Sequence, residues 1–170
     1  MHPARFYFDV CSSRMYNPPM PKTLTYQQDF SIRAPAQTIL DFLINPENHL
    51  HLHPLVQRID ILEHGTTPEG HPFVVFDVTD LLRMMGFPFK VKYRTKMIHF
   101  PTENKLYLDA VSPGNVTTQV SWTMQEKDGL TRLHEDVSLT APSLLANYSI
   151  NQSKQSHQGM FARLKEKMEK

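Results

Sequence analysis

One stretch of the sequence decides the fold, and it reads LTYQQDFSIRAPAQTILDFLINP over residues 24–46. Its first nine residues alternate between apolar or aromatic and polar side chains, which predicts a half-buried strand over 24–32. Pro35 suits the first turn of a helix, and Asn45-Pro46 ends it. One face of this helix carries Ile39, Phe42 and Leu43. A second short helical turn is expected over 46–50.

Downstream of this stretch, the pattern predicts six more strands and a final helix. The strand-like segments lie at 55–63, 73–82, 88–100, 105–112, 116–126 and 130–140. Short, turn-rich gaps separate them, which favours antiparallel neighbours over crossovers through helices. After Ala141-Pro142 the pattern becomes helical, from about Ser143 to near Lys170. The sequence therefore predicts an α+β protein.

This order of elements resembles the START-like or SRPBCC superfamily, which includes polyketide cyclases and lipid-transport proteins. The resemblance covers about residues 23–170 and rests on three patterns: FSIRAPAQTILDF at 30–42 followed by Asn45-Pro46-Glu47, HPLV at 53–56, and Thr140-Ala141-Pro142 before the last helix. It implies the helix-grip fold, a seven-stranded antiparallel sheet wrapped around the C-terminal helix, with two short helices between strands 1 and 2. It also implies a cavity that accepts an apolar molecule. Members include carriers, sensors and cyclases, so the fold leaves the activity open.

Composition excludes several classes of function. The chain of 170 residues fits one domain, and its formal net charge of +1 gives no positive field to attract nucleic acid. Cys11 is the single cysteine, so a zinc-binding thiolate cluster is excluded and a reducing, cytoplasmic location is expected. No run approaches the ~18 apolar residues of a membrane span. We expect no integral membrane segment and no cofactor.

The first 22 residues differ from the rest, because they contain four prolines and show no sustained period. We interpret 1–22 as a flexible N-terminal arm and 23–170 as a START-like ligand-binding domain. An alternative interpretation is that translation begins at Met20, directly before the patterned region.

Alternation within three strands predicts the side chains that face the core. Strand 88–100 would turn inward Phe89, Val91, Tyr93, Thr95, Met97 and His99. Strand 116–126 would turn inward Val116, Thr118, Val120, Trp122 and Met124. Strand 131–139 would turn inward Thr131, Leu133, Glu135, Val137 and Leu139. The opposite face of 88–100 is a basic row, which favours a solvated surface over a phosphate-bearing partner or an anionic membrane: Lys90, Lys92, Arg94 and Lys96.

Glu135 is the exception on its apolar face, and a buried carboxylate needs a donor, a water or a raised pKa. It is therefore the first candidate for a polar anchor in the cavity and, with His99, for an acid or base. The competing interpretation is that Glu135 pairs with a structural partner or turns to solvent at a bulge. The predicted ligand-binding residues are His53, Tyr93, Thr95, Thr118, Val120, Trp122, Glu135, Tyr148, Gln152 and Gln155.

Small residues recur along the final helix at spacings of three and four, which leaves room beneath its middle: Ala146, Ser149, Ser153 and Ser156. Gln152 and Gln155 would reach into this space. In the alternative, the serines face solvent and the helix packs by its other side.

Two further patterns have competing explanations. His49, His51 and His53 alternate, and on a strand they would share one side and could chelate a transition metal. Pro54 and the lack of an assisting cysteine favour solvated or pocket-rim histidines, so we expect no metal site. The loop 81–87, LLRMMGF, is too apolar to lie in water. It would close the cavity, make transient membrane contact, form a homodimer contact or pack on the N-terminal arm.

Nucleophile elbows, phosphate-binding glycine loops and paired zinc motifs do not occur in the sequence. The leading hypothesis is a protein that binds or carries a small hydrophobic molecule, such as a lipid, an isoprenoid or a polyketide-like compound. The alternative is an enzyme of the polyketide cyclase or dehydratase type that uses Glu135 or His99 as acid or base. A third hypothesis is an interaction module that dimerises through loop 81–87.

Overall fold

The computed structural model describes residues 20–84 and 86–170, and its elements follow the predicted order. The strands are β1 (Pro21–Ile32), β2 (Val56–Thr66), β3 (Pro72–Met84), β4 (Phe87–Phe100), β5 (Lys105–Ser112), β6 (Val116–Lys127) and β7 (Leu130–Pro142). The helices are α1 (Ala36–Leu43), α2 (His49–Leu52) and α3 (Ser143–Met168), with short 3-10 turns η1 (Pro46–Asn48) and η2 (Pro101–Glu103).

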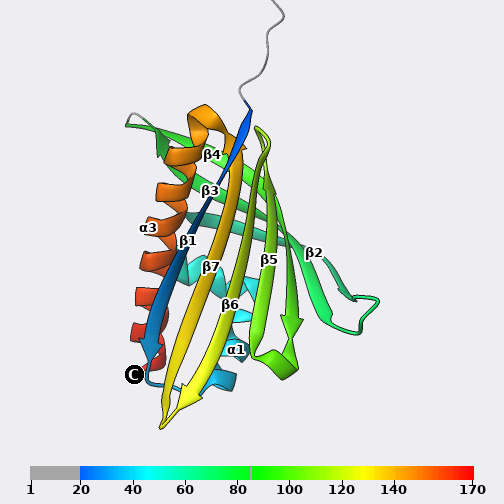
Figure 1. The fold of residues 1–170 in the computed structure, drawn as a ribbon, viewed down its shortest axis with the longest axis vertical. Coiled ribbons are helices and arrows are strands. Elements are labelled where there is room, and N and C mark those ends of the chain that lie inside the picture. Colours follow the sequence, from blue (N-terminus) through cyan, green and yellow to red (C-terminus); the bar gives the residue numbers. More distant parts are fainter. Residues whose placement is uncertain (1–19, 85) are drawn as a thin grey trace, which may run out of the picture.

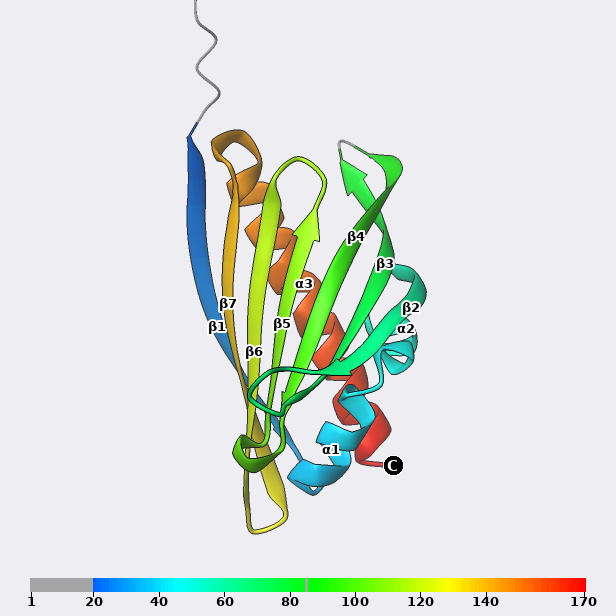
Figure 2. The same cartoon turned by 90° about the vertical axis from the view of Figure 1, so that its right-hand side faces the viewer.

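The strands described form one antiparallel sheet in the order β1-β7-β6-β5-β4-β3-β2. It curves around α3, which crosses its concave side, while α1 and α2 lie near the C-terminal end of α3 (Figures 1 and 2). The first and last strands are neighbours, with Phe30 opposite Leu133. The predicted helix-grip fold is confirmed.

Turn chemistry sets the hairpins and the helix starts. Asp128 and Gly129 link β6 to β7 with positive φ angles of 53° and 73°, the conformation of a tight hairpin turn. Pro35 lies one residue before α1, at its N-cap, with a φ of −58°. The side chain of Asn45 accepts a hydrogen bond from the Glu47 amide and so begins η1.

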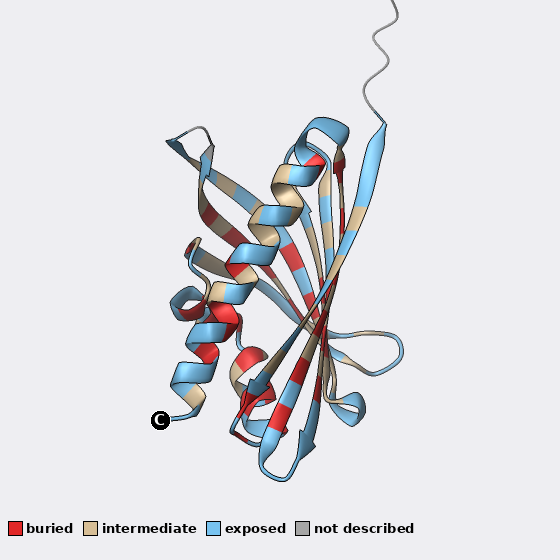
Figure 3. Ribbon diagram, turned by 60° about the vertical axis from the view of Figure 1, so that its left-hand side comes forward, coloured by how far each residue is buried: buried red, intermediate tan, exposed pale blue. Residues whose placement is uncertain are grey.

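The solid core lies between the C-terminal half of α3, α1 and the lower part of the sheet (Figure 3). Phe161 of α3 packs on Phe30 with ring centroids 4.5 Å apart and on Trp122 at 5.5 Å. The N-terminal half of α3 turns small side chains such as Ser149 and Ser153 toward the sheet, and Ala146 is its buried residue there, against Leu139 and Ala141. One half of the helix therefore anchors it, and the other half leaves space beneath.

Two predicted boundaries are wrong. β1 begins at Pro21, so Pro21 and Lys22 pair with Pro142 and Ala141 in the sheet rather than belonging to an arm. Residues 1–19 of that predicted arm lie outside the described residues. Loop 81–87 is also shorter than predicted, because Leu81 and Leu82 continue the β3–β4 ladder and Phe87 already belongs to β4.

The β3–β4 hairpin extends beyond its neighbour in the sheet. β4 pairs with β5 from Arg94 onward, so the segment Phe87–Tyr93 has β3 as its paired strand among the described residues. Its end lies beside the first turns of α3 (Figure 1), where the Tyr148 hydroxyl donates to the Arg83 carbonyl oxygen at 2.9 Å. No helix in the described part of the chain is long and apolar enough to cross a membrane.

Candidate functional site

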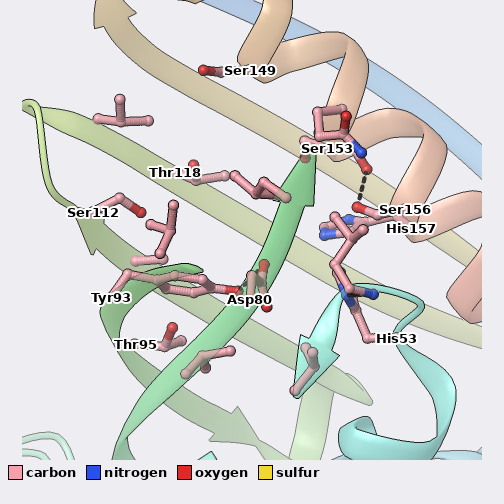
Figure 4. A pocket seen from close by; sticks show the side chains of 18 of the residues that line it. His53, Asp80, Tyr93, Thr95, Ser112, Thr118, Ser149, Ser153, Ser156 and His157 are labelled. Carbon is pink, nitrogen blue, oxygen red and sulfur yellow. Dashed lines mark hydrogen bonds between the residues drawn. The ribbon is translucent and has the colours of Figure 1, made fainter. Parts of the chain in front are cut away.

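A cavity of about 370 Å³ lies between the sheet and the N-terminal half of α3. Its walls are mostly apolar, because alternate residues of β3, β4 and β6 face it. Ser149, Ser153 and Ser156 of α3 line it from the other side (Figure 4). The serines therefore face the cavity, and their small size provides the space that the sequence pattern predicted.

The cavity has a buried end and an exposed end. Phe76, Trp122 and Met160 close the inner end, and all three are almost fully buried. Lining residues at the other end come from the β3–β4 hairpin, the β5–β6 turn and the start of α3, where Leu145 is exposed. A small molecule can therefore enter near the N-terminus of α3.

Most of the predicted ligand-binding residues line this cavity: His53, Tyr93, Thr95, Thr118, Val120, Trp122, Tyr148 and Gln152. Three predicted residues do not. Gln155 is exposed on α3, because it lies one step around the helix from the face defined by Ser149, Ser153 and Ser156. His99 shares the inward face of β4, but it lies beyond the cavity, near Asp41 of α1.

Glu135 is the third, and it lies behind the cavity wall with no exposed surface. Its carboxylate accepts hydrogen bonds from Trp122 Nε1 at 2.7 Å, His157 Nδ1 at 2.6 Å and Gln28 Nε2 at 2.8 Å. Burial raises the pKa of Glu135, but the charge of His157 and these three hydrogen bonds outweigh it, so the pKa lies below its ordinary value. Glu135 therefore has structural partners and no bulge turns it to solvent.

His157 links the buried carboxylate of Glu135 to the cavity, because it bonds to Glu135 and lines the cavity. Its Nδ1 faces Glu135, which as an ionised carboxylate only accepts, so Nδ1 holds a hydrogen. The Tyr26 hydroxyl lies 3.3 Å from the same Nδ1 and 3.0 Å from Ser153 Oγ. The pair of Glu135 and His157 thus has the arrangement of an oriented base.

Asp80 is a second titratable group in the wall, at the centre of Figure 4. It is 7% exposed, and its Oδ2 accepts from the Tyr93 hydroxyl at 3.2 Å. Its Oδ1 is buried and has no hydrogen-bond partner among residues 20–84 and 86–170. Burial raises the pKa of Asp80 to about 6, against the opposing effects of Tyr93 and His157.

The histidines at 49–53 do not share one face, because the segment forms α2 rather than a strand. His49 is buried and its Nε2 donates to the Leu43 carbonyl at 2.8 Å, while His51 is exposed. His53 lines the cavity with its ring centroid 5.7 Å from that of His157. Burial lowers the pKa of His49 to about 4 and that of His53 well below its ordinary value, so both are neutral near pH 7.

Sequence reasoning missed Asp80 and His157 as cavity residues. The signal for Asp80 was present, since Phe76, Val78, Asp80 and Leu82 alternate and all four line the cavity. His157 follows Ser153 by four residues on the small-residue face of α3. The sequence does not reveal that Asp80 and His157 line the same cavity.

The fold and the cavity together define a protein with the helix-grip fold and a cavity between sheet and helix. The chain belongs to the family described as "Domain of unknown function (DUF7053)", whose model matches residues 22–170. A search of curated proteins gives no match.

Solved structures support the same fold class. The Zhui aromatase/cyclase from Streptomyces sp. R1128 is similar with a TM-score of 0.72 and 13% identity, over 87% of this chain and 94% of that one. A START superfamily protein from Mycobacterium smegmatis gives a TM-score of 0.60 at 13% identity, over 84% and 97%. Ara h 8.0201 gives 0.65 at 15% identity, over 86% and 98%. At these identities the likeness shows the fold alone.

Proposed function

We propose that this protein binds or carries a small hydrophobic molecule, such as a lipid, an isoprenoid or a polyketide-like compound, in the cavity between the sheet and α3. The observation that carries the proposal is the cavity itself, about 370 Å³ of space with a mostly apolar wall. A void of this size among well-packed side chains forfeits stability unless a ligand fills it. The single cysteine favours a cytoplasmic location for this activity.

Nile red, a neutral apolar dye, tests the proposal in combination with matched variants of β6. Thr118→Trp places a large ring inside the cavity, while Thr117→Trp places the same ring on the exposed face of the same strand. We expect the wild type and Thr117→Trp to bind Nile red and Thr118→Trp to lose binding, with circular dichroism verifying the fold. Native mass spectrometry of the same preparations then gives the mass of a copurifying ligand. Failure of the wild type to bind, or retained binding by Thr118→Trp, would contradict the proposal.

A second candidate function is acid–base catalysis of the cyclase or dehydratase type. It is favoured by the pair of Glu135 and His157, because the buried carboxylate orients a histidine that lines the cavity. In this form of the hypothesis Glu135 acts through His157, and His99 has no part because it lies beyond the cavity.

Dehydration of 4-hydroxy-4-phenylbutan-2-one tests this candidate. The base removes a proton from the carbon beside the carbonyl, the hydroxyl group leaves as water, and a conjugated enone that absorbs ultraviolet light forms. We expect the wild type and His134→Gln, a surface control, to accelerate the reaction and His157→Gln not to. Equal rates for all three proteins would remove the catalytic candidate and leave the binding proposal.

The exposed end of the cavity also favours contact with a partner. Phe87 is 77% exposed and Leu144 86%, and Lys22, Arg83 and Lys90 lie on the segments around them. We propose transient contact with a membrane here, with homodimerisation as the competing proposal. Phe87→Asp combined with Leu144→Asp should abolish sedimentation with anionic vesicles. If the double variant has a lower mass than the wild type by light scattering but sediments with vesicles to the same extent, the homodimer is favoured.

A further inference from the structure

Asp80 lines the cavity, and one of its carboxylate oxygens has no hydrogen-bond partner among the described residues. Its side chain is more than nine-tenths buried, Oδ2 is held by the Tyr93 hydroxyl at 3.2 Å, and Oδ1 has no hydrogen-bond partner within the described residues. Since a buried carboxylate oxygen without a donor is costly, Oδ1 calls for a donor that residues 20–84 and 86–170 do not provide. Val78 and Leu82 flank Asp80 on the cavity face of β3, so that donor must belong to an otherwise apolar molecule.

The described lining of the cavity has an acidic side chain, Asp80, and lacks basic lysine and arginine side chains. The other titratable groups that face the cavity are His49, His53, His157, Tyr93 and Tyr148. Of these, His49 and His53 are neutral near pH 7, and His157 is already paired with the buried carboxylate of Glu135. A bound carboxylate would meet Asp80 without a lysine or arginine among the described lining residues to balance the two charges.

We propose that Asp80 selects ligands by a hydroxyl group: the cavity accepts apolar molecules that carry a hydrogen-bond-donating hydroxyl and rejects the corresponding carboxylic acids. The inference rests on the proposed binding function and specifies its ligand class. A hydroxyl matches the site because it supplies one donor for one free acceptor. An ammonium group brings three donors, and two of them would lack this partner.

Three probes with similar alkyl chains and different polar groups test this selectivity. They are 1-decanol, which has a hydroxyl donor; decyl methyl ether, which lacks the donor; and decanoate, which carries a negative charge. Trp122 is the protein's single tryptophan and lines the cavity, so its emission reports binding directly. At about pH 8, above the pKa of Asp80, we expect 1-decanol to bind roughly tenfold or more tightly than either of the others.

Asp80→Asn removes the charge and nearly keeps the shape. In this variant we expect decanoate to gain at least about tenfold in affinity relative to 1-decanol. Asp77→Asn is the matched control, because Asp77 lies on the same strand but on its outer face, paired with Lys92 and Arg94. Asp77→Asn should keep the order of affinities for the three probes that we expect of the wild type.

The outcomes distinguish this inference from the binding proposal. If Nile red binds but the wild type holds the three probes equally, or prefers decanoate, the inference is overturned and the binding proposal stands. If neither Nile red nor any of the three probes binds, both are overturned. The comparison in the wild type needs no variant, so it holds even where Asp80→Asn folds poorly.

Discussion

Glu135 joins three strands and a helix through one side chain. Its carboxylate on β7 accepts from Gln28 on β1, Trp122 on β6 and His157 on α3. The lowered pKa of Glu135 means that the ionised form is the one these donors stabilise. The residue therefore fixes the helix to the sheet while staying out of reach of a ligand.

Replacing this carboxylate should cost much more stability than replacing an exposed one. In Glu135→Gln a neutral amide replaces the buried carboxylate and places its NH₂ group against the donors of Trp122 and His157, so we expect the free energy of unfolding to fall by about 3 kcal/mol. Urea denaturation followed by Trp122 emission measures the loss. Asp136→Asn, the next residue along β7, is the control and should change stability by less than about 1 kcal/mol. Equal losses in the two variants would show that the buried cluster contributes nothing special.

The β3–β4 hairpin is the element that borders the exposed end of the cavity. Its segment Phe87–Tyr93 has no pairing with β5, and the Tyr148 hydroxyl holds Arg83 to α3. Local opening of the hairpin therefore has to break few backbone hydrogen bonds.

Tyr148→Phe should speed ligand exchange. Removal of the hydroxyl frees the Arg83 carbonyl, and we expect association and dissociation of 1-decanol both to accelerate by about threefold, with little change in Kd. Stopped-flow recording of Trp122 emission gives both rates. Tyr107→Phe on β5, away from the cavity, is the control. A change in Kd with unaltered association would show instead that Tyr148 acts on the bound ligand.

The helix α3 shows how side-chain volume sets the cavity. Ser149 lines the cavity, and its side chain has no hydrogen bond to another described residue, whereas Asn151 lies on the exposed side of the same helix. Ser149→Leu should fill part of the space and weaken 1-decanol binding by about tenfold, while thermal stability stays the same or rises. Asn151→Leu should leave binding unchanged. Loss of binding in both variants would point to a change of the whole helix.

Over the whole molecule, buried histidines and Asp80 respond to acid in opposite directions. His49 and His53 have lowered pKa values, that of His49 about 4, so the stability linked to them is present above about pH 6.5 and is lost progressively as the pH falls below it. Asp80 has a raised pKa of about 6, so its unfavourable ionisation is relieved over the same window. The pKa values of His99 and Glu135 are lowered as well, so among the described residues the losses exceed the gain at Asp80 and acidification should destabilise the fold.

Asp80→Asn should make this acid sensitivity steeper, because it removes a carboxyl group whose raised pKa opposes it. Between about pH 6 and pH 4.5 we expect the fall in unfolding free energy to steepen by up to roughly 1.4 kcal/mol per pH unit, measured by urea denaturation at each pH. Asp77→Asn is again the control, since the pKa of Asp77 is lowered and it stays ionised across this window. A slope that is the same in Asp80→Asn and wild type would exclude Asp80 as a titrating group here.

The order of helices and strands could be predicted from local sequence patterns. The polar contacts in and around the cavity could not, because they join residues far apart in the sequence. Alternation placed Tyr93, Thr118 and Trp122 on the inward face because strand geometry has a period of two. The same alternation included His99, but it could not show that α1 covers that end of β4. Contact between Glu135 and His157 depends on how α3 is rotated against the sheet, which no local pattern encodes.

That rotation has a consequence for how the family can diversify. Because the polar cluster around Glu135 and the packing of Phe161 hold α3 in place, Ser149 need not contribute to holding the helix, whereas Ser153 bonds to Tyr26 of β1. Exchanges at Ser149 can therefore reshape the cavity without changing the rotation of the helix. Evolution or protein engineering can in this way adapt the same fold to different ligands through single substitutions in the cavity wall.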